Sequence, residues 1–113
     1  MKYPPPPHPA PSKPDFVPPP GACDAHVHVF GPQKTFAYHQ ARTYTPVDAP
    51  KERLRELHGL LGFDRSIIVQ ATCHGTDNSA TLDAIASSNG RWRGVAIVDE
   101  TFSEADFELL HAG

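Results

Sequence analysis

Three short apolar segments alternate with three segments of helical periodicity, and this order constrains the fold more than any other feature of the chain. The apolar segments span residues 21–31, 66–71 and 94–99. Strands that alternate with helices are typical of a parallel sheet with right-handed crossovers. The sequence therefore predicts an α/β fold made of three consecutive βα units.

The helical segments carry start and stop signals. Asp48 is the expected N-cap of the first helix, with Pro50 in its first turn and Gly62 at its C-terminal cap. Between them, leucines recur at spacings of three and four, which predicts one apolar face. Ser103 and Asp106 form a variant capping box that predicts the start of the third helix.

The number of βα units sets the expected domain organisation. A (β/α)8 barrel takes about 250 residues, and this chain of 113 residues supplies three of its eight units. We expect residues 21–113 to form the N-terminal part of such a TIM-like barrel, so that the chain is truncated relative to a complete one. A small open α/β domain is the alternative.

Residues 1–20 differ in composition from the rest, because ten of the thirteen prolines lie there. Proline cannot donate to a strand ladder and favours extended polyproline II structure. We expect an extended arm laid across or in front of the domain. The alternative is a docking ligand for an aromatic groove.

The first apolar segment carries the residues most suggestive of chemistry. Read as a strand that ends at Gly31, it places Asp24, His26 and His28 on one face, with Phe30 at the exit. The other face would carry Cys23, Ala25, Val27 and Val29. Two histidines separated by one residue lie roughly 6–7 Å apart on a strand, close enough to share one ion or one substrate oxygen. The alternative is a pair of surface or core histidines, since the chain has seven.

Further polar residues fall near the ends of the predicted strands. His28 lies near the carboxyl end of the first predicted strand, and His74 and Asp99 lie at the ends of the second and third. Ligands of parallel α/β folds bind at these carboxyl ends. The loop 33–48 is longer than an ordinary connection and contains Tyr44. These positions together predict a site at one end of the sheet.

Composition narrows the classes of partner. A net charge of −3 and a pI near 6.1 give no electrostatic reason to bind nucleic acid or an anionic membrane. No apolar run approaches the roughly 20 residues of a membrane span, and no signal-peptide core is present. The two cysteines do not suggest a disulfide framework. We expect a cytoplasmic protein; its oligomeric state is not predicted.

Three stretches in order resemble one family. Residues 21–32, 44–50 and 69–75 are similar to the amidohydrolase-related barrels, in the branch that includes the 2-pyrone-4,6-dicarboxylate hydrolases and other lactone hydrolases. The resemblance implies hydrolysis of a carboxylated lactone in aromatic-compound degradation, with water attacking the ring ester carbonyl. The partner would be a small dicarboxylate or lactone.

The resemblance also implies roles for individual residues. His26 and His28 would either hold a divalent metal such as zinc or, in metal-independent members, contact the substrate as electrophilic catalysts. Tyr44, Thr72 and His74 would line the substrate pocket. The positions that match the family's carboxylate-binding arginines and its aspartate general base fall beyond Gly113.

Two other functions stay open at this point. One is a different amidohydrolase reaction, such as that of a sugar lactonase or an aromatic-acid decarboxylase. The other is a non-catalytic α/β fragment whose proline-rich arm recruits a partner.

Overall fold

A parallel three-stranded sheet with helices in its connections organises the chain. A computed structural model describes all residues, 1–113. The strands are β1 (Cys23–Val27), β2 (Arg65–Val69) and β3 (Trp92–Val95) in the spatial order β1-β2-β3. The helices are α1 (Lys51–Leu61), α2 (Ser79–Ala86) and α3 (Glu104–Ala112), with a single 3-10 turn, η1 (Thr72–His74). The predicted α/β class and the parallel pairing are confirmed.

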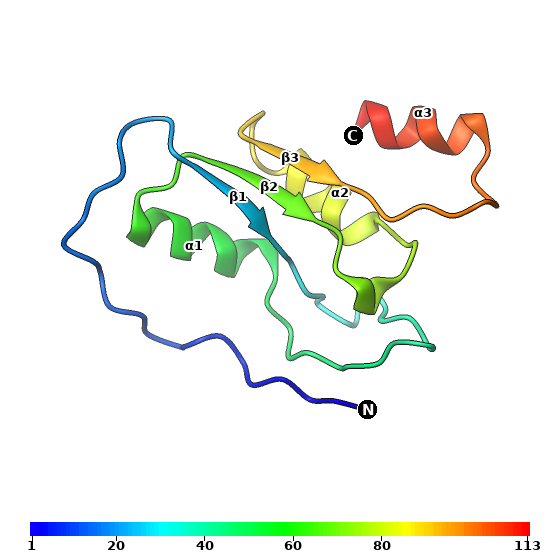
Figure 1. Cartoon of the computed structure of the whole chain (residues 1–113), viewed down its shortest axis with the longest axis horizontal. Helices are drawn as coiled ribbons and strands as arrows, with labels where there is room; N and C mark the ends of the chain where they lie inside the picture. The colour runs from blue at the N-terminus through cyan, green and yellow to red at the C-terminus, as the bar shows by residue number, and fades with distance from the viewer.

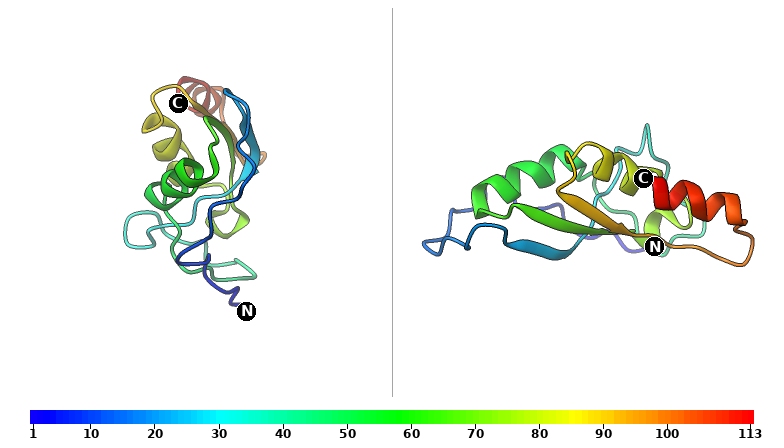
Figure 2. Two further views of the ribbon diagram at one scale, coloured as in Figure 1. Left: turned by 90° about the vertical axis from the view of Figure 1, so that its left-hand side faces the viewer. Right: turned by 90° about the horizontal axis from the view of Figure 1, so that it is seen from above.

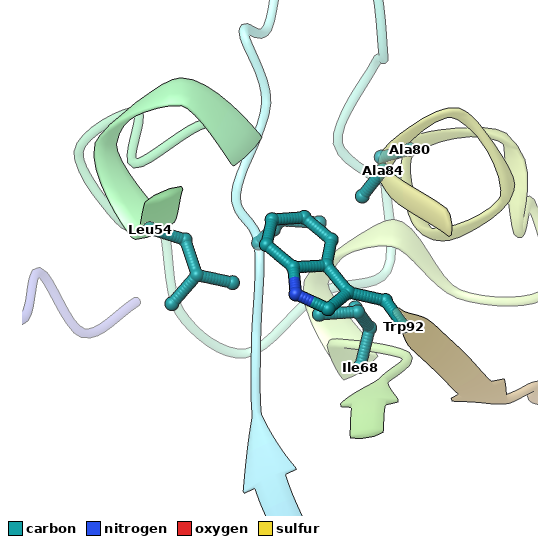
Figure 3. Close-up of a cluster of buried hydrophobic side chains, with 6 residues drawn as sticks. Leu54, Ile68, Ala80, Ala84 and Trp92 are labelled. Atoms are coloured by element: carbon teal, nitrogen blue, oxygen red, sulfur yellow. The ribbon is translucent and has the colours of Figure 1, made fainter. Parts of the chain in front are cut away.

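Helices α1 and α2 cover one face of this sheet, and no helix covers the other (Figures 1 and 2). We call the second face the open face. Trp92 fills the space between the sheet and the two helices, lying between Leu54 of α1 and Ala84 of α2 and against Ile68 of β2 (Figure 3). The larger of the two buried clusters therefore lies on the helix side of the sheet.

Helix α1 begins two residues later than predicted. Its N-cap is Pro50, which has no side chain to cap the helix, and its C-cap Gly62 takes the left-handed conformation expected of it, with φ of 86°. Asp48 has another role. Its Oδ1 accepts hydrogen bonds from the Tyr38 hydroxyl at 2.9 Å and the Gln33 N–H at 3.1 Å, so the carboxylate closes the preceding loop.

Strand β1 contains a bulge, which changes the predicted sorting of its side chains. Asp24 pairs with Ser66 and Val27 with Ile68, so three steps along β1 match two along β2. The extra residue shifts the alternation between Asp24 and Val27. Asp24 therefore lies on the helix side of the sheet, where its Oδ2 is 2.9 Å from Nε2 of His58 on α1.

The prediction that Asp24 shares a face with His26 and His28 is wrong for this reason. Val27 and Val29 still pack towards the core, as predicted, whereas Ala25 is exposed. The strand also ends at Val27 rather than at Gly31. Phe30 instead forms an isolated antiparallel bridge with Ala49.

Strand β3 begins two residues earlier than predicted and ends at Val95. Trp92 is its first residue and pairs with Ser66. Its indole is part of the core. Gly94 lets α2 approach closely, since a Cβ atom there would lie 2.6 Å from Cδ1 of Ile85. Asp99 lies beyond the strand and accepts a hydrogen bond from the Thr101 backbone N–H at 2.9 Å.

Helix α3 buries none of its residues, so its own capping interactions largely determine whether it forms. The predicted capping box is confirmed: Asp106 N–H donates to the Ser103 hydroxyl at 3.2 Å, and Ser103 N–H donates to the Asp106 carboxylate at 2.8 Å. The backbone and hydroxyl bonds from Ser103 lower the pKa of Asp106.

We expect α3 to fray on acidification. A carboxylate whose pKa is lowered in the folded state stabilises that state above its unfolded pKa of about 3.9, and the stabilisation is lost as the pH falls through the folded pKa. Amide chemical shifts of residues 103–107 should move towards random-coil values below about pH 4. The D106N variant should lack this step, and a step that persists in D106N would contradict the assignment.

The proline-rich arm runs back from the start of β1 past α1 (Figure 1). It is extended and almost wholly exposed. The Arg53 guanidinium of α1 donates to the carbonyls of His8 at 3.2 Å and Pro9 at 2.5 Å. None of the three helices has the length and apolar character needed to cross a bilayer.

Candidate active site

His26 and His28 lie side by side on the open face. Their ring centroids are 5.3 Å apart with an interplanar angle of 89°, and both residues are exposed. The Nδ1 atom of His28 is 2.8 Å from the carbonyl oxygen of Val69. Because a carbonyl only accepts hydrogen bonds, Nδ1 carries the proton, and Nε2 is left to bind a ligand. The neighbouring strand β2 thus fixes the tautomer of His28.

The histidine pair continues into a row of side chains. The Phe30 ring lies 5.9 Å from that of His28 and 6.5 Å from that of Tyr44. The Thr72 hydroxyl donates to the Tyr44 hydroxyl over 3.4 Å. We call His26, His28, Phe30, Tyr44 and Thr72 the site row. Side chains from segments far apart in the sequence meet in the site row: from β1 and the residues after it, from the loop 33–48, and from η1.

Burial keeps the Tyr44 phenol at the end of the site row neutral. Burial raises the pKa of Tyr44, so its phenol stays protonated and keeps its proton available for donation. Cys73 lies behind it, fully buried, and burial likewise raises the pKa of its thiol. The wall behind the row is therefore uncharged.

The structure places His74 outside the site row. Its buried ring accepts a hydrogen bond from Gly31 N–H at Nε2, over 3.2 Å, and donates from Nδ1 to the Ala37 carbonyl over 3.0 Å. Both ring nitrogens therefore hold the loop that follows β1 against η1. Contact of His74 with a substrate stays a prediction.

The residues of this chain do not by themselves fit a metal centre. No group of three or more His, Cys, Asp or Glu side chains lies close enough to hold an ion. His26 and His28 offer two nitrogens, whereas catalytic zinc takes three protein ligands. Asp24, the nearest acidic residue in the sequence, pairs with His58 on the other face of the sheet.

Comparison with known proteins places the chain in a family. The sequence profile of the family described as amidohydrolase matches residues 23–113. The chain belongs to the amidohydrolase family. It is 54% identical to a 2-pyrone-4,6-dicarboxylate hydrolase from Comamonas testosteroni, over 89% of this chain and 33% of that protein. It is 48% identical to a 4-sulfomuconolactone hydrolase from Hydrogenophaga intermedia, over 68% of this chain and 25% of that protein.

Solved structures agree with this assignment. An apo structure from Agrobacterium tumefaciens superposes with a TM-score of 0.73 and 34% identity, over 88% of this chain and 36% of that one. A protein from Acinetobacter baumannii, described as a probable 2-pyrone-4,6-dicarboxylic acid hydrolase with citric acid bound, gives a TM-score of 0.73 at 27% identity, over 81% of this chain and 34% of that one. The chain thus spans about a third of the length of these relatives.

All predicted site residues lie within the part of the chain that matches the amidohydrolase family. Sequence reasoning nevertheless gave Phe30 no role beyond its place at the strand exit, although it joins the histidines to Tyr44. It also missed the bond between Tyr38 and Asp48 that closes the loop carrying Tyr44. The length of this loop was the only signal for such a contact.

Proposed function

We propose that the chain forms the first three βα units of a (β/α)8 barrel hydrolase that acts on a carboxylated lactone of aromatic degradation. Three parallel βα units in an amidohydrolase-family chain support the architecture. The relatives named for 2-pyrone-4,6-dicarboxylate and 4-sulfomuconolactone support an anionic lactone as the substrate class. The row of aromatic side chains favours a planar, conjugated ring.

The observation that carries this proposal is the fixed ring orientation of His28. Water attack on a lactone carbonyl places negative charge on the carbonyl oxygen, and donors fixed in advance around that oxygen stabilise the transition state. The bond from His28 to Val69 fixes the ring, and the T-shaped contact with His26 places a second imidazole beside it. Nε2 of His28 can donate to the ester carbonyl oxygen only in the doubly protonated ring, because Nδ1 already carries the proton bonded to Val69, and in that form the two histidines would polarise the carbonyl.

Other members of the site row would orient the substrate. The Phe30 ring offers an apolar surface to the lactone ring, and the neutral Tyr44 hydroxyl, which accepts from Thr72, can donate its own proton to a carboxylate. The two histidines are given the electrophilic role here, so the general base that deprotonates the attacking water would lie outside the row. The row supplies binding and the electrophilic half of the reaction.

The test uses the seven histidines as internal probes. We expect 2-pyrone-4,6-dicarboxylate to shift the imidazole carbon-bound proton signals of His26 and His28 in NMR spectra. The signal of His111, which is exposed on α3 and lies outside the row, should stay unchanged. Ring opening is followed in the same sample by loss of pyrone absorbance, with and without a chelator. Equal shifts of all histidines, or no shifts, would contradict the proposal.

A further inference from the structure

The N-terminal end of the proline-rich arm is attached beside Tyr44. Lys2 N–H donates to the Thr43 carbonyl at 3.1 Å, and Thr45 N–H donates to the Lys2 carbonyl at 2.8 Å. These two bonds form a parallel bridge in which Lys2 pairs with Tyr44. Together with the bonds from Arg53 to His8 and Pro9, they attach the arm at two separate places. Lys2 therefore has a defined position next to the site row.

A cavity of about 750 Å³ lies between the arm and the site row. Lys2, Tyr3 and the run Pro4–Pro7 line one side of it, and Phe30 and Tyr44 line the other. Small-molecule sites commonly occupy about 300–1,000 Å³ and combine apolar walls with a few polar groups. The cavity has this size and these walls, and it shares Phe30 with the histidine pair.

Lys2 provides the only charged side chain among the residues that line this cavity. It belongs to none of the four ion pairs in the structure. The Lys2 ammonium is therefore free to pair with an anion, and no carboxylate of the lining competes for it. Such a local positive charge would offset the repulsion between an anionic ligand and a chain whose net charge is −3.

We propose that Lys2 binds a carboxylate of the substrate and that the arm forms the outer wall of the substrate pocket. This inference rests on the proposed function, which supplies an anionic lactone as the ligand. With one carboxylate at Lys2, the ring lies against Phe30 and Tyr44. The ring carbonyl is then directed towards His28, whose ring neighbours that of Phe30. The arm is part of the site and not a separate docking segment.

The test measures binding of pyridine-2,4-dicarboxylate, a stable planar dicarboxylate, to the full chain by calorimetry. The K2Q variant removes the charge but keeps the backbone bonds of residue 2. We expect K2Q to raise Kd about fivefold, the scale of one partly exposed charge pair. K2R should retain the affinity of the unchanged chain. K13Q serves as the matched control because Lys13 lies in the same arm but does not line the cavity.

Two further comparisons make the result specific. The loss in K2Q should shrink between about 20 mM and about 500 mM salt, because salt screens charge pairs. Neutral 2-pyrone should bind the unchanged chain and K2Q equally. A Kd for K2Q within twofold of that of the unchanged chain, or an equal loss in K13Q, would overturn the role of Lys2.

The outcomes also separate this inference from the proposed function. If K2Q leaves binding unchanged while the dicarboxylate still shifts the His26 and His28 signals, the proposed function stands and the inference fails. If K2Q weakens binding but the histidine signals do not respond, the cavity binds carboxylates away from His26 and His28. In that case the proposed function fails, and the role of Lys2 as a substrate ligand fails with it. Absence of any dicarboxylate binding to the unchanged chain overturns the inference outright.

Discussion

In a full-length barrel enzyme, replacing His28 with alanine is expected to lower the rate of pyrone ring opening by about 100-fold or more, the usual effect of removing one donor from an oxyanion site. His28 is the residue of the site row whose orientation a neighbouring strand fixes, through the bond of Nδ1 to Val69. Its loss removes the Nε2 atom proposed to face the carbonyl oxygen. The measurement is the initial rate of absorbance loss with 2-pyrone-4,6-dicarboxylate.

The matched control is H111A, which removes an exposed histidine on α3, away from the site row. It should leave the rate unchanged. Circular dichroism should show the same helix content in H28A as in the unchanged chain, because the His28 side chain is exposed and outside the core. A rate for H28A within threefold of that of the unchanged chain would remove His28 from the chemistry.

Replacing Trp92 with alanine is expected to abolish cooperative unfolding. Trp92 is 5% exposed and contacts both helices and β2 within the core cluster (Figure 3). The Arg55 guanidinium lies 5.5 Å from its ring centroid, and the His58 ring packs against it edge-on at 6.0 Å. Truncating a buried tryptophan costs about 3–5 kcal/mol. Small domains have only about 5–15 kcal/mol of stability in total.

The measurement is urea-induced unfolding followed by circular dichroism. W92F should unfold cooperatively at a lower urea concentration than the unchanged chain, because it keeps part of the buried ring. L109A is the control, since Leu109 is 70% exposed and its loss should change the free energy of unfolding by less than about 0.5 kcal/mol. A W92A midpoint equal to that of the unchanged chain would mean that the core is not organised around this indole.

Much of the fold follows from local patterns because several elements agree with their own sequence preferences. Gly62 and the pair Ser103–Asp106 end and begin helices as their chemistry predicts. In the β-branched run of β2, Ile68 is fully buried, and Ile67 and Val69 are half-buried. These features depend only on residues close in the sequence, so sequence reasoning can find them.

The wrong predictions concern residues whose positions depend on contacts with residues distant in the sequence. A period of two placed Asp24 with His26, but the register with β2 inserts one residue and turns Asp24 towards His58. Asp48 was assigned as a cap from its position, but Tyr38 and the Gln33 N–H take its oxygen. The partners of His74, Gly31 and Ala37, were likewise not predicted, and its contact with a substrate stays a prediction. No local pattern records such pairings.

The position of the larger core cluster also has a consequence for the electrostatics of the site. Because the larger core cluster lies on the helix side, the exposed histidine pair on the open face lies next to bulk water. In bulk water, two unit charges 4 Å apart interact with an energy of about 1 kcal/mol. The same interaction is about 4 kcal/mol where the effective dielectric constant is near 20. Any structure that covers the open face and excludes water would therefore strengthen the electrostatic interactions of His26 and His28 with a substrate, even if neither ring moved. The polarising role proposed for the pair would therefore depend on the exclusion of water as well as on its geometry.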